Sequence, residues 1–299
     1  MELIFFIEVL AGGLLAGVMY ALVALGFVLI YKASGVFNFA QGSMVFFAAL
    51  TFVSLTERGW NFWLALVVTL GVMVLLAVAT ERVVLRPLVN QAPITLFMAT
   101  IGLAFVLEGL SQLLWGSQPH GLELGIPDVP MEWLSRKWNV NISQFDLFAA
   151  FVAGALVAVL ALLFQKTRIG RALRAVADDH QAALAVGIPL QHIWVIVWAV
   201  AGFVALVAGV MWGVRNGVQY ALTFVALKAL PVLILGGFES ILGAIIGGLI
   251  IGAGEKLAEV YLGPYVGGGI ESWFAYVIAL LFLLVRPEGL FGEKHIDRV

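Results

Sequence analysis

A few polar side chains interrupt the long apolar segments of this sequence, and the chemistry they offer is hydrogen bonding. Asn38 and Gln41 lie three residues apart, which would place both amides on one helix face, and Gly42 lets another backbone approach beside them. Glu108 is a carboxylate within an apolar stretch that ends at Trp115. An ionised carboxylate in hydrocarbon needs water or a polar partner. We therefore take Asn38, Gln41, Gly42 and Glu108 as candidates for a path that carries a polar solute.

Each candidate also has a purely structural interpretation. Asn38 and Gln41 could form only hydrogen bonds between helices. Glu108 could be protonated, or hydrogen bonded within helix packing with Gln112 one turn away. The sequence leaves both interpretations open for these residues. For Lys228 we expect a position at the membrane edge.

The composition indicates which elements must position these residues. Of 299 residues, 63% are hydrophobic and 11% are charged, whereas a soluble chain of this size needs more charge to cover its surface. Helices are the open-ended structure that satisfies its own backbone hydrogen bonds in hydrocarbon. The sequence therefore predicts an all-α, multi-pass helix bundle in the lipid bilayer. It argues against nucleic acid as a partner.

Charge-free stretches predict about nine transmembrane segments, with eight as the alternative. The weakest is 218–237, because Pro231 and the pair Gly236-Gly237 predict a discontinuous helix broken at both points. The other predicted segments are residues 9–31, 36–56, 60–80, 92–115, 147–165, 191–214, 241–258 and 272–285.

The placement of basic residues predicts which loops face the cytoplasm. Lys32, Arg82, Arg86 and the cluster from Lys166 to Arg174 fall on one side, which the positive-inside rule assigns to the cytoplasm. We expect residues 1–299 to form a single transmembrane domain with the N-terminus outside. Its external loop would be 116–146 and its cytoplasmic loop 166–190.

Four pairs of glycines are spaced four residues apart, so each pair would share one helix face and let another backbone come close. We favour packing within the chain over a dimerisation motif. The pairs are Gly13 and Gly17, Gly213 and Gly217, Gly243 and Gly247, and Gly248 and Gly252.

Short motifs that mark enzymes are absent from the sequence. It has no G-x-x-x-x-G-K-[ST] to cradle ATP phosphates, no H-E-x-x-H and no G-x-S-x-G. There is no cysteine, and the four histidines are too scattered to indicate a metal site. We expect a chain that is not an enzyme and that binds no metal and no cofactor of its own.

The predicted cytoplasmic loop reads as one or two short helices. Asp178 and Asp179 could cap the second helix, and Gly187 with Pro189 would end it. The alanine-rich surface suits docking in a groove of another protein. A merely basic anchor beside the membrane would explain the arginines but not the alanines.

This loop resembles the cytoplasmic coupling loop of permease subunits from branched-chain amino-acid ABC importers. Further similar stretches are 38–42, 81–87 and 286–292, and their order is similar to that of the first of the two paralogous permeases. With Leu235-Gly236-Gly237 and Gly243-Ala244 the resemblance covers nearly the whole chain. Its loop residues are Gly170, Arg171, Ala172, Arg174, Ala175, Asp179, Ala182, Ala183, Gly187 and Ile188. The chain departs from the family at Gln41-Gly42-Ser43, where His-Gly-Glu is usual.

The resemblance implies an ABC importer permease fold in the bacterial inner membrane. The implied partners are a paralogous permease, two cytoplasmic ATPase subunits that bind the ATP, and an extracytoplasmic substrate-binding protein. Alternating access would carry branched-chain amino acids or a related small polar solute such as urea, a short amide or another amino acid. The binding protein usually sets that choice.

The alternative from another class is a stand-alone secondary transporter or channel, and behind it an intramembrane enzyme. A secondary transporter should show several acids or bases within its membrane segments for ion coupling. In the sequence, Glu108 is the one clear case.

Overall fold

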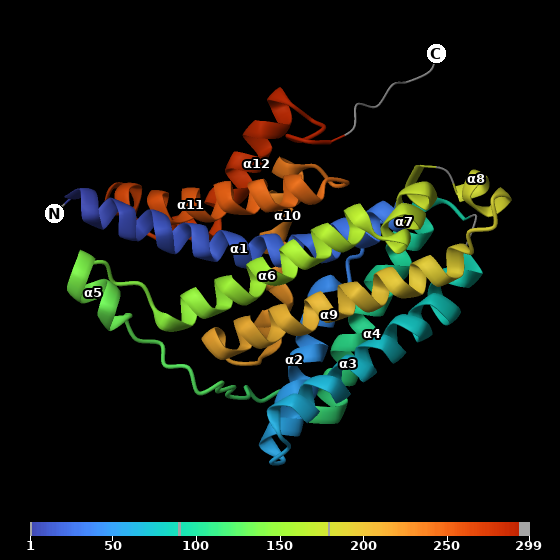
Figure 1. The fold of residues 1–299 in the computed structure, drawn as a ribbon, viewed down its shortest axis with the longest axis horizontal. Helices are drawn as coiled ribbons and strands as arrows, with labels where there is room; N and C mark the ends of the chain where they lie inside the picture. The colour runs from blue at the N-terminus through green and yellow to red at the C-terminus, as the bar shows by residue number, and fades with distance from the viewer. Residues whose placement is uncertain (1, 89–90, 179, 293–299) are drawn as a thin grey trace. The chain divides into compact units, whose positions relative to one another are not determined.

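The computed structural model describes residues 2–88, 91–178 and 180–292 (Figure 1). These residues form helices and no named strand. The α-helices are α1 Glu2–Ser34, α2 Gln41–Glu57, α3 Phe62–Ala79, α4 Pro93–Trp115, α5 Glu132–Trp138, α6 Gln144–Lys166, α7 Arg168–Asp178, α8 His180–Ala185, α9 Leu190–Asn216, α10 Val225–Gly236, α11 Ile241–Val266 and α12 Phe274–Val285. Short helical turns lie at η1 Thr80–Leu85, η2 Arg86–Leu88, η3 Tyr220–Phe224 and η4 Ile270–Ser272.

Six described helices are long and apolar enough to cross a membrane, which confirms the predicted helical membrane protein. They are Leu3–Ser34, Phe62–Leu88, Ile94–Trp115, Gln144–Lys166, Leu190–Asn216 and Ile241–Val266. Two further apolar helices, Tyr220–Gly236 and Phe274–Val285, are shorter. The count of nine segments stays a prediction.

The structure corrects two boundaries drawn from the sequence. The segment predicted at 36–56 becomes helical only at Gln41, because residues 36–38 have no regular secondary structure and residues 39–40 form a turn before α2. In the segment 218–237, Pro231 lies inside α10 without ending it. Instead the helix changes from η3 to α10 at Val225 and ends at Gly236, before Gly237 with a φ of 101°. A proline removes one backbone hydrogen bond, but packing against neighbouring helices makes that loss tolerable. Pro231 therefore did not mark the end of a helix.

The described residues form two compact units. The first contains residues 2–24, 124–158 and 228–292, and the second contains the described parts of Leu25–Glu123 and Val159–Leu227.

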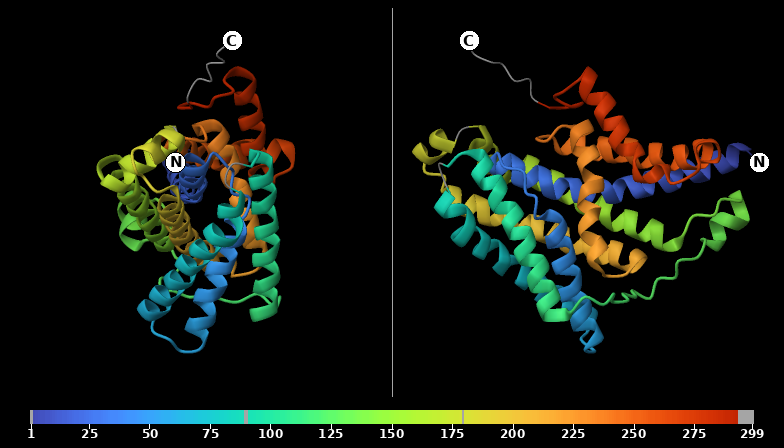
Figure 2. Two further views of the ribbon diagram at one scale, coloured as in Figure 1. Left: turned by 90° about the vertical axis from the view of Figure 1, so that its right-hand side faces the viewer. Right: turned by 180° about the vertical axis from the view of Figure 1, so that it is seen from behind.

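In the first unit, α1 and α11 pack through their glycines. A Cβ added at Gly17 would lie 2.5 Å from the carbonyl oxygen of Gly248, and one at Gly13 would lie 2.7 Å from that of Gly252. Both distances are shorter than real Cβ contacts allow, so the glycines permit this backbone approach. Figures 1 and 2 show α1 and α11 side by side. The predicted packing within the chain is confirmed for these pairs.

Of the other two glycine pairs, one forms a packing face and the other does not. Gly243 and Gly247 let α11 approach α10, since a Cβ at Gly243 would lie 2.1 Å from the carbonyl oxygen of Gly236. Gly213 and Gly217 do not form a packing face, because Gly217 follows the end of α9 with a φ of 72°. The helical spacing assumed for that pair was wrong.

In the second unit, α2 is the central helix and packs against α3, α4 and α9. Its residues from Gln41 to Ser54 are all buried. Gly42 is the point of closest approach, where an added Cβ would lie 2.1 Å from the carbonyl oxygen of Thr223 in η3. Figure 2 shows α2 and α4 side by side. The core around α2 thereby sets the positions of the candidate polar residues on α2, α4 and η3.

Candidate functional site: a carboxylate held by hydroxyl groups, and a helical pair

Glu108 on α4 is joined to two other elements of the second unit. The hydroxyl of Ser43 on α2 donates a hydrogen bond of 2.7 Å to its Oε1. The hydroxyl of Tyr220 on η3 donates one of 3.1 Å to its Oε2. Gln112, the partner in the packing alternative, is exposed, and the two described hydrogen bonds of Glu108 go to other residues.

Aromatic rings surround Tyr220 beside this carboxylate. The ring of Phe46 stands edge-on to Tyr220 with centroids 6.2 Å apart, and Phe224 does the same at 5.8 Å. Tyr220 and Phe224 are 44% and 53% exposed, whereas Phe46 is buried. The site therefore combines a half-buried acid with an exposed aromatic surface.

Asn38 and Gln41 come together, although the predicted reason was wrong. Asn38 precedes α2 rather than sharing a helix face with Gln41. Its Oδ1 accepts a hydrogen bond of 3.1 Å from the backbone N–H of Ala40, and its Nδ2 donates one of 3.3 Å to Gln41 Oε1. Gln41 Nε2 in turn donates to the carbonyl of Ala201 on α9 at 3.5 Å. This chain of bonds fixes the entry into α2.

Both amides are fully buried, and glycine makes room for one of them. A Cβ at Gly26 on α1 would lie 2.3 Å from Gln41 Nε2. In this conformation Asn38 and Gln41 thus face the interior of the second unit, while Glu108 reaches its surface. Their place on a transport path stays a prediction.

The loop for which we predicted one or two short helices contains two, α7 and α8. Gly170 allows α7 to fold back on the end of α6, because a Cβ there would lie 2.0 Å from the carbonyl oxygen of Phe164. The guanidinium of Arg174 donates to the carbonyl of Phe164 and, at 3.3 Å, to that of Gln165. A cation near these last carbonyls also interacts favourably with the negative end of the α6 dipole. Gly170 and Arg174 therefore fix the turn from α6 into α7.

Gly187 ends α8 as expected, with a φ of 85°. Its N–H donates to the carbonyl of Leu184 at 3.0 Å, and the N–H of Ile188 donates to that of Ala183 at 2.9 Å. Asp179, which we proposed as a cap, lies outside the described residues.

The surface of this helical pair is less alanine-rich than predicted. Arg171 and Ala182 are exposed, and Ala172 and Ala175 are half-buried, but Ala183 is only 2% exposed. Large apolar side chains complete the surface: Ile169, Leu184 and Val186 are 40%, 53% and 75% exposed.

The first unit contains a cluster of ionisable groups that the sequence did not reveal. Glu255, near the middle of α11, is 3% exposed and accepts a hydrogen bond of 3.0 Å from the Tyr20 hydroxyl. Lys228 Nζ lies 4.0 Å from Glu255 and 3.4 Å from Tyr20. Lys256 forms an ion pair with Glu271 beside them. Lys228, expected at a membrane edge, thus belongs to a polar cluster among apolar helices.

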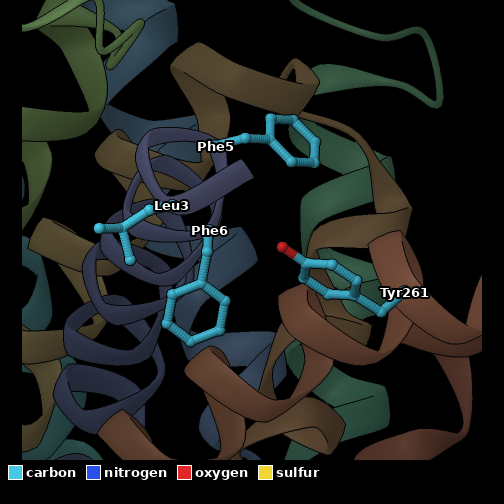
Figure 3. Close-up of a pocket in the computed structure, with 4 residues that line it drawn as sticks. All are labelled: Leu3, Phe5, Phe6 and Tyr261. Atoms are coloured by element: carbon cyan, nitrogen blue, oxygen red, sulfur yellow. The ribbon is translucent and has the colours of Figure 1, made fainter. Parts of the chain in front are cut away.

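An apolar hollow of about 730 Å³ lies between the ends of α1 and α11 in the first unit (Figure 3). It is lined by Leu3, Phe5, Phe6 and Tyr261, and the hydroxyl of Tyr261 points toward the space beside the two phenylalanines (Figure 3). The described residues that line it carry no charge, so we do not assign the polar solute to it. Among the described residues no group of three histidine, aspartate or glutamate side chains could hold a metal ion.

Comparison with known proteins gives matches along the whole chain. A family model described as "Branched-chain amino acid transport system / permease component" matches residues 9–286. LivH of Escherichia coli (strain K12), named a high-affinity branched-chain amino acid transport system permease protein, is 28% identical over 100% of this chain and 99% of its own length. BraD of Pseudomonas aeruginosa carries the same description and is 28% identical over 100% of this chain and 99% of its own. FruF of Bifidobacterium longum, a fructose import permease protein, is 24% identical over 90% of this chain and 75% of its own.

Proposed function

The chain belongs to the family of branched-chain amino acid transport permeases, as its resemblance in sequence predicted, and we propose that it is the membrane-spanning permease subunit of an ATP-driven importer. This proposal rests on the sequence matches to LivH and BraD. Each match spans the whole of this chain and almost the whole of the relative. A permease contributes the membrane path and no ATPase chemistry, which agrees with the absence of a phosphate-binding motif in the sequence.

The proposed importer is a heteromer in the bacterial inner membrane. In it, this chain pairs with a paralogous permease, two cytoplasmic ATPase subunits supply the energy, and an extracytoplasmic binding protein delivers the solute. We propose about nine membrane segments in a single permease domain. Six described helices long enough to cross alone, two shorter apolar helices and the 17-residue α2 support this count.

The helical pair α7–α8 is proposed as the contact with an ATPase subunit. Support comes from its surface, on which Leu184, Val186 and the cation Arg171 are each exposed, and from the turn that fastens α7 to α6. Movement of an ATPase subunit would reach α6 through that turn. Nine of the proposed coupling residues lie in or directly after this pair, and Asp179 lies outside the described residues. The nine are Gly170, Arg171, Ala172, Arg174, Ala175, Ala182, Ala183, Gly187 and Ile188.

The proposed solute is a branched-chain amino acid or a related small polar molecule. The names of LivH and BraD favour the amino acid, while the more distant FruF is named for fructose. The proposed part of the path consists of Glu108 together with Asn38, Gln41 and Gly42, which lie in the same unit.

The test is uptake by the reconstituted complex. The chain is coexpressed with the ATPase, permease and binding-protein genes of the neighbouring reading frames, and uptake of radiolabelled leucine into vesicles is measured with ATP and with ADP. We expect uptake with ATP alone. Uptake of equal rate with ADP would contradict the importer and favour the stand-alone transporter.

A matched pair of variants tests the ATPase contact within the same assay. Ala182→Arg places bulk and charge on the exposed surface of α8, and we expect uptake to fall about tenfold while the chain still inserts. Gln118→Arg, an exposed position in the loop after α4, is the control. Ala183 is unsuitable because an arginine there would be buried and would unfold α8. Unchanged uptake in Ala182→Arg would remove α8 from the coupling surface.

A further inference from the structure

Glu108 has no basic side chain as a partner in the part of the chain that the structure describes. Within residues 2–88, 91–178 and 180–292, no lysine, arginine or histidine forms an ion pair with Glu108. Its described partners, Ser43 and Tyr220, are neutral hydroxyl groups. A carboxylate in a membrane-crossing helix without a cation is costly, and such groups are seldom retained unless they act on something that passes.

We propose that Glu108, held by Ser43 and Tyr220, binds the protonated primary amino group of the solute. This deepens the proposed function, on which it rests, by assigning the solute class: an ammonium-bearing molecule rather than a neutral amide, urea or sugar. Binding would place the ammonium against the carboxylate, which is the strongest hydrogen-bond acceptor available to such a donor.

The carboxylate has room for this extra donor. A carboxylate offers about four lone-pair positions to hydrogen-bond donors. Ser43 uses one on Oε1 and Tyr220 uses one on Oε2, so the two hydroxyls orient the group and leave acceptor positions free. Because the hydroxyls come from α2 and η3 and the acid from α4, three elements hold the carboxylate in one orientation.

The surface next to Glu108 fits the rest of an apolar amine. The side chains of Tyr220 and Phe224 are 44% and 53% exposed, and an ammonium above the ring of Tyr220 would also gain a cation–π attraction. A branched aliphatic group can cover the ring of Phe224 while the ammonium meets Glu108. Neutral polar solutes would gain the hydroxyl contacts but would leave the carboxylate without a cation.

Three probes with the same branched chain separate charge from shape: isopentylamine is a cation, isopentanol is neutral and isovalerate is an anion. Their dissociation constants are measured by saturation-transfer NMR on the full chain in lipid nanodiscs at constant ionic strength. We expect the amine to bind at least about tenfold more tightly than the alcohol, and isovalerate to bind most weakly. Equal affinities of amine and alcohol would overturn the proposal.

Variants locate the effect at the proposed acid. Glu108→Gln should lower the affinity for isopentylamine to that for isopentanol, and Glu108→Asp should keep a preference for the amine. The control is Glu57→Gln, which removes a carboxylate that pairs with His120 in the same unit. Selective amine binding that survives in Glu108→Gln would also overturn the proposal. If Glu108→Gln fails to fold, the selectivity of the unmodified chain and of Glu108→Asp still decides.

Failure of the ammonium site can be distinguished from failure of the proposed importer. If the reconstituted complex takes up leucine with ATP but the chain shows no preference for the amine, the importer stands and the ammonium site falls. If the amine binds selectively through Glu108 but uptake does not depend on ATP, the importer falls instead.

Discussion

Two acids within membrane-crossing helices have opposite surroundings in this protein. Glu255, in the first unit, is buried and is met by the ammonium of Lys228 and the hydroxyl of Tyr20. Glu108, in the second unit, is half-buried, and its partners among the described residues are the hydroxyls of Ser43 and Tyr220. The first acid is neutralised by the chain itself, whereas the second is held in place without a cation. The difference separates an acid that stabilises the fold from one that is available to a ligand.

The largest expected effect comes from removing the cation of the first cluster. Lys228→Met leaves Glu255 buried without its counter-charge, and we expect the free energy of unfolding to fall by about 2–3 kcal/mol, less than for a fully buried pair because Lys228 is one-third exposed. Thermal unfolding in detergent measures it. The double variant Lys228→Met/Glu255→Gln should recover most of the loss.

The control for this effect is Arg136→Met, which breaks the exposed ion pair with Glu132 on α5 and should cost less than about 1 kcal/mol. If Lys228→Met were no worse than Arg136→Met, the first cluster would not stabilise the fold, and the contrast with Glu108 would fail.

A smaller effect is expected when the first cluster is disturbed from α1. Gly17→Ala forces a Cβ against the carbonyl of Gly248 and so shifts Tyr20, three residues further on, away from Glu255. We expect a loss of about 1–2 kcal/mol. Gly12→Ala is the matched control, since nothing lies within 4 Å of a Cβ there and alanine is the better helix former. Equal unfolding temperatures for the two variants would contradict close packing of α1 on α11.

The smallest effect on stability is expected at Glu108. Glu108→Gln removes a charge while the amide can still accept from Ser43 or Tyr220, so the free energy of unfolding should change by less than about 1 kcal/mol. Leucine uptake by the complex should nevertheless fall about tenfold. A variant that lost stability and uptake together would place Glu108 in the same structural class as Glu255.

Local patterns in the sequence predicted most of the helices and the close packing of glycines. Apolar runs identify helices in a membrane protein, because the backbone has no other way to bond in hydrocarbon. Gly13 and Gly17 were read correctly for the same reason, since a helix fixes which residues share a face. The same assumption misplaced Asn38, because the residue lies just before α2 rather than in it.

Partners distant along the chain could not be predicted. Nothing near Glu255 in sequence indicates that Lys228 and Tyr20 will meet it, and nothing near Glu108 indicates Ser43 and Tyr220. Such pairs depend on how helices lie against one another, and that is set by packing over whole helix faces rather than by local spacing. The sequence marked Glu108 as unusual, but only the structure gave its surroundings.

The turn between α6 and α7 has a further consequence for association. Thr167 alone separates the two helices, and Arg174 ties α7 to the final carbonyls of α6. A flexible loop that docks on a partner loses conformational entropy for every residue it orders. In this segment α7 is already ordered before a partner arrives, so docking does not cost the entropy of ordering its backbone.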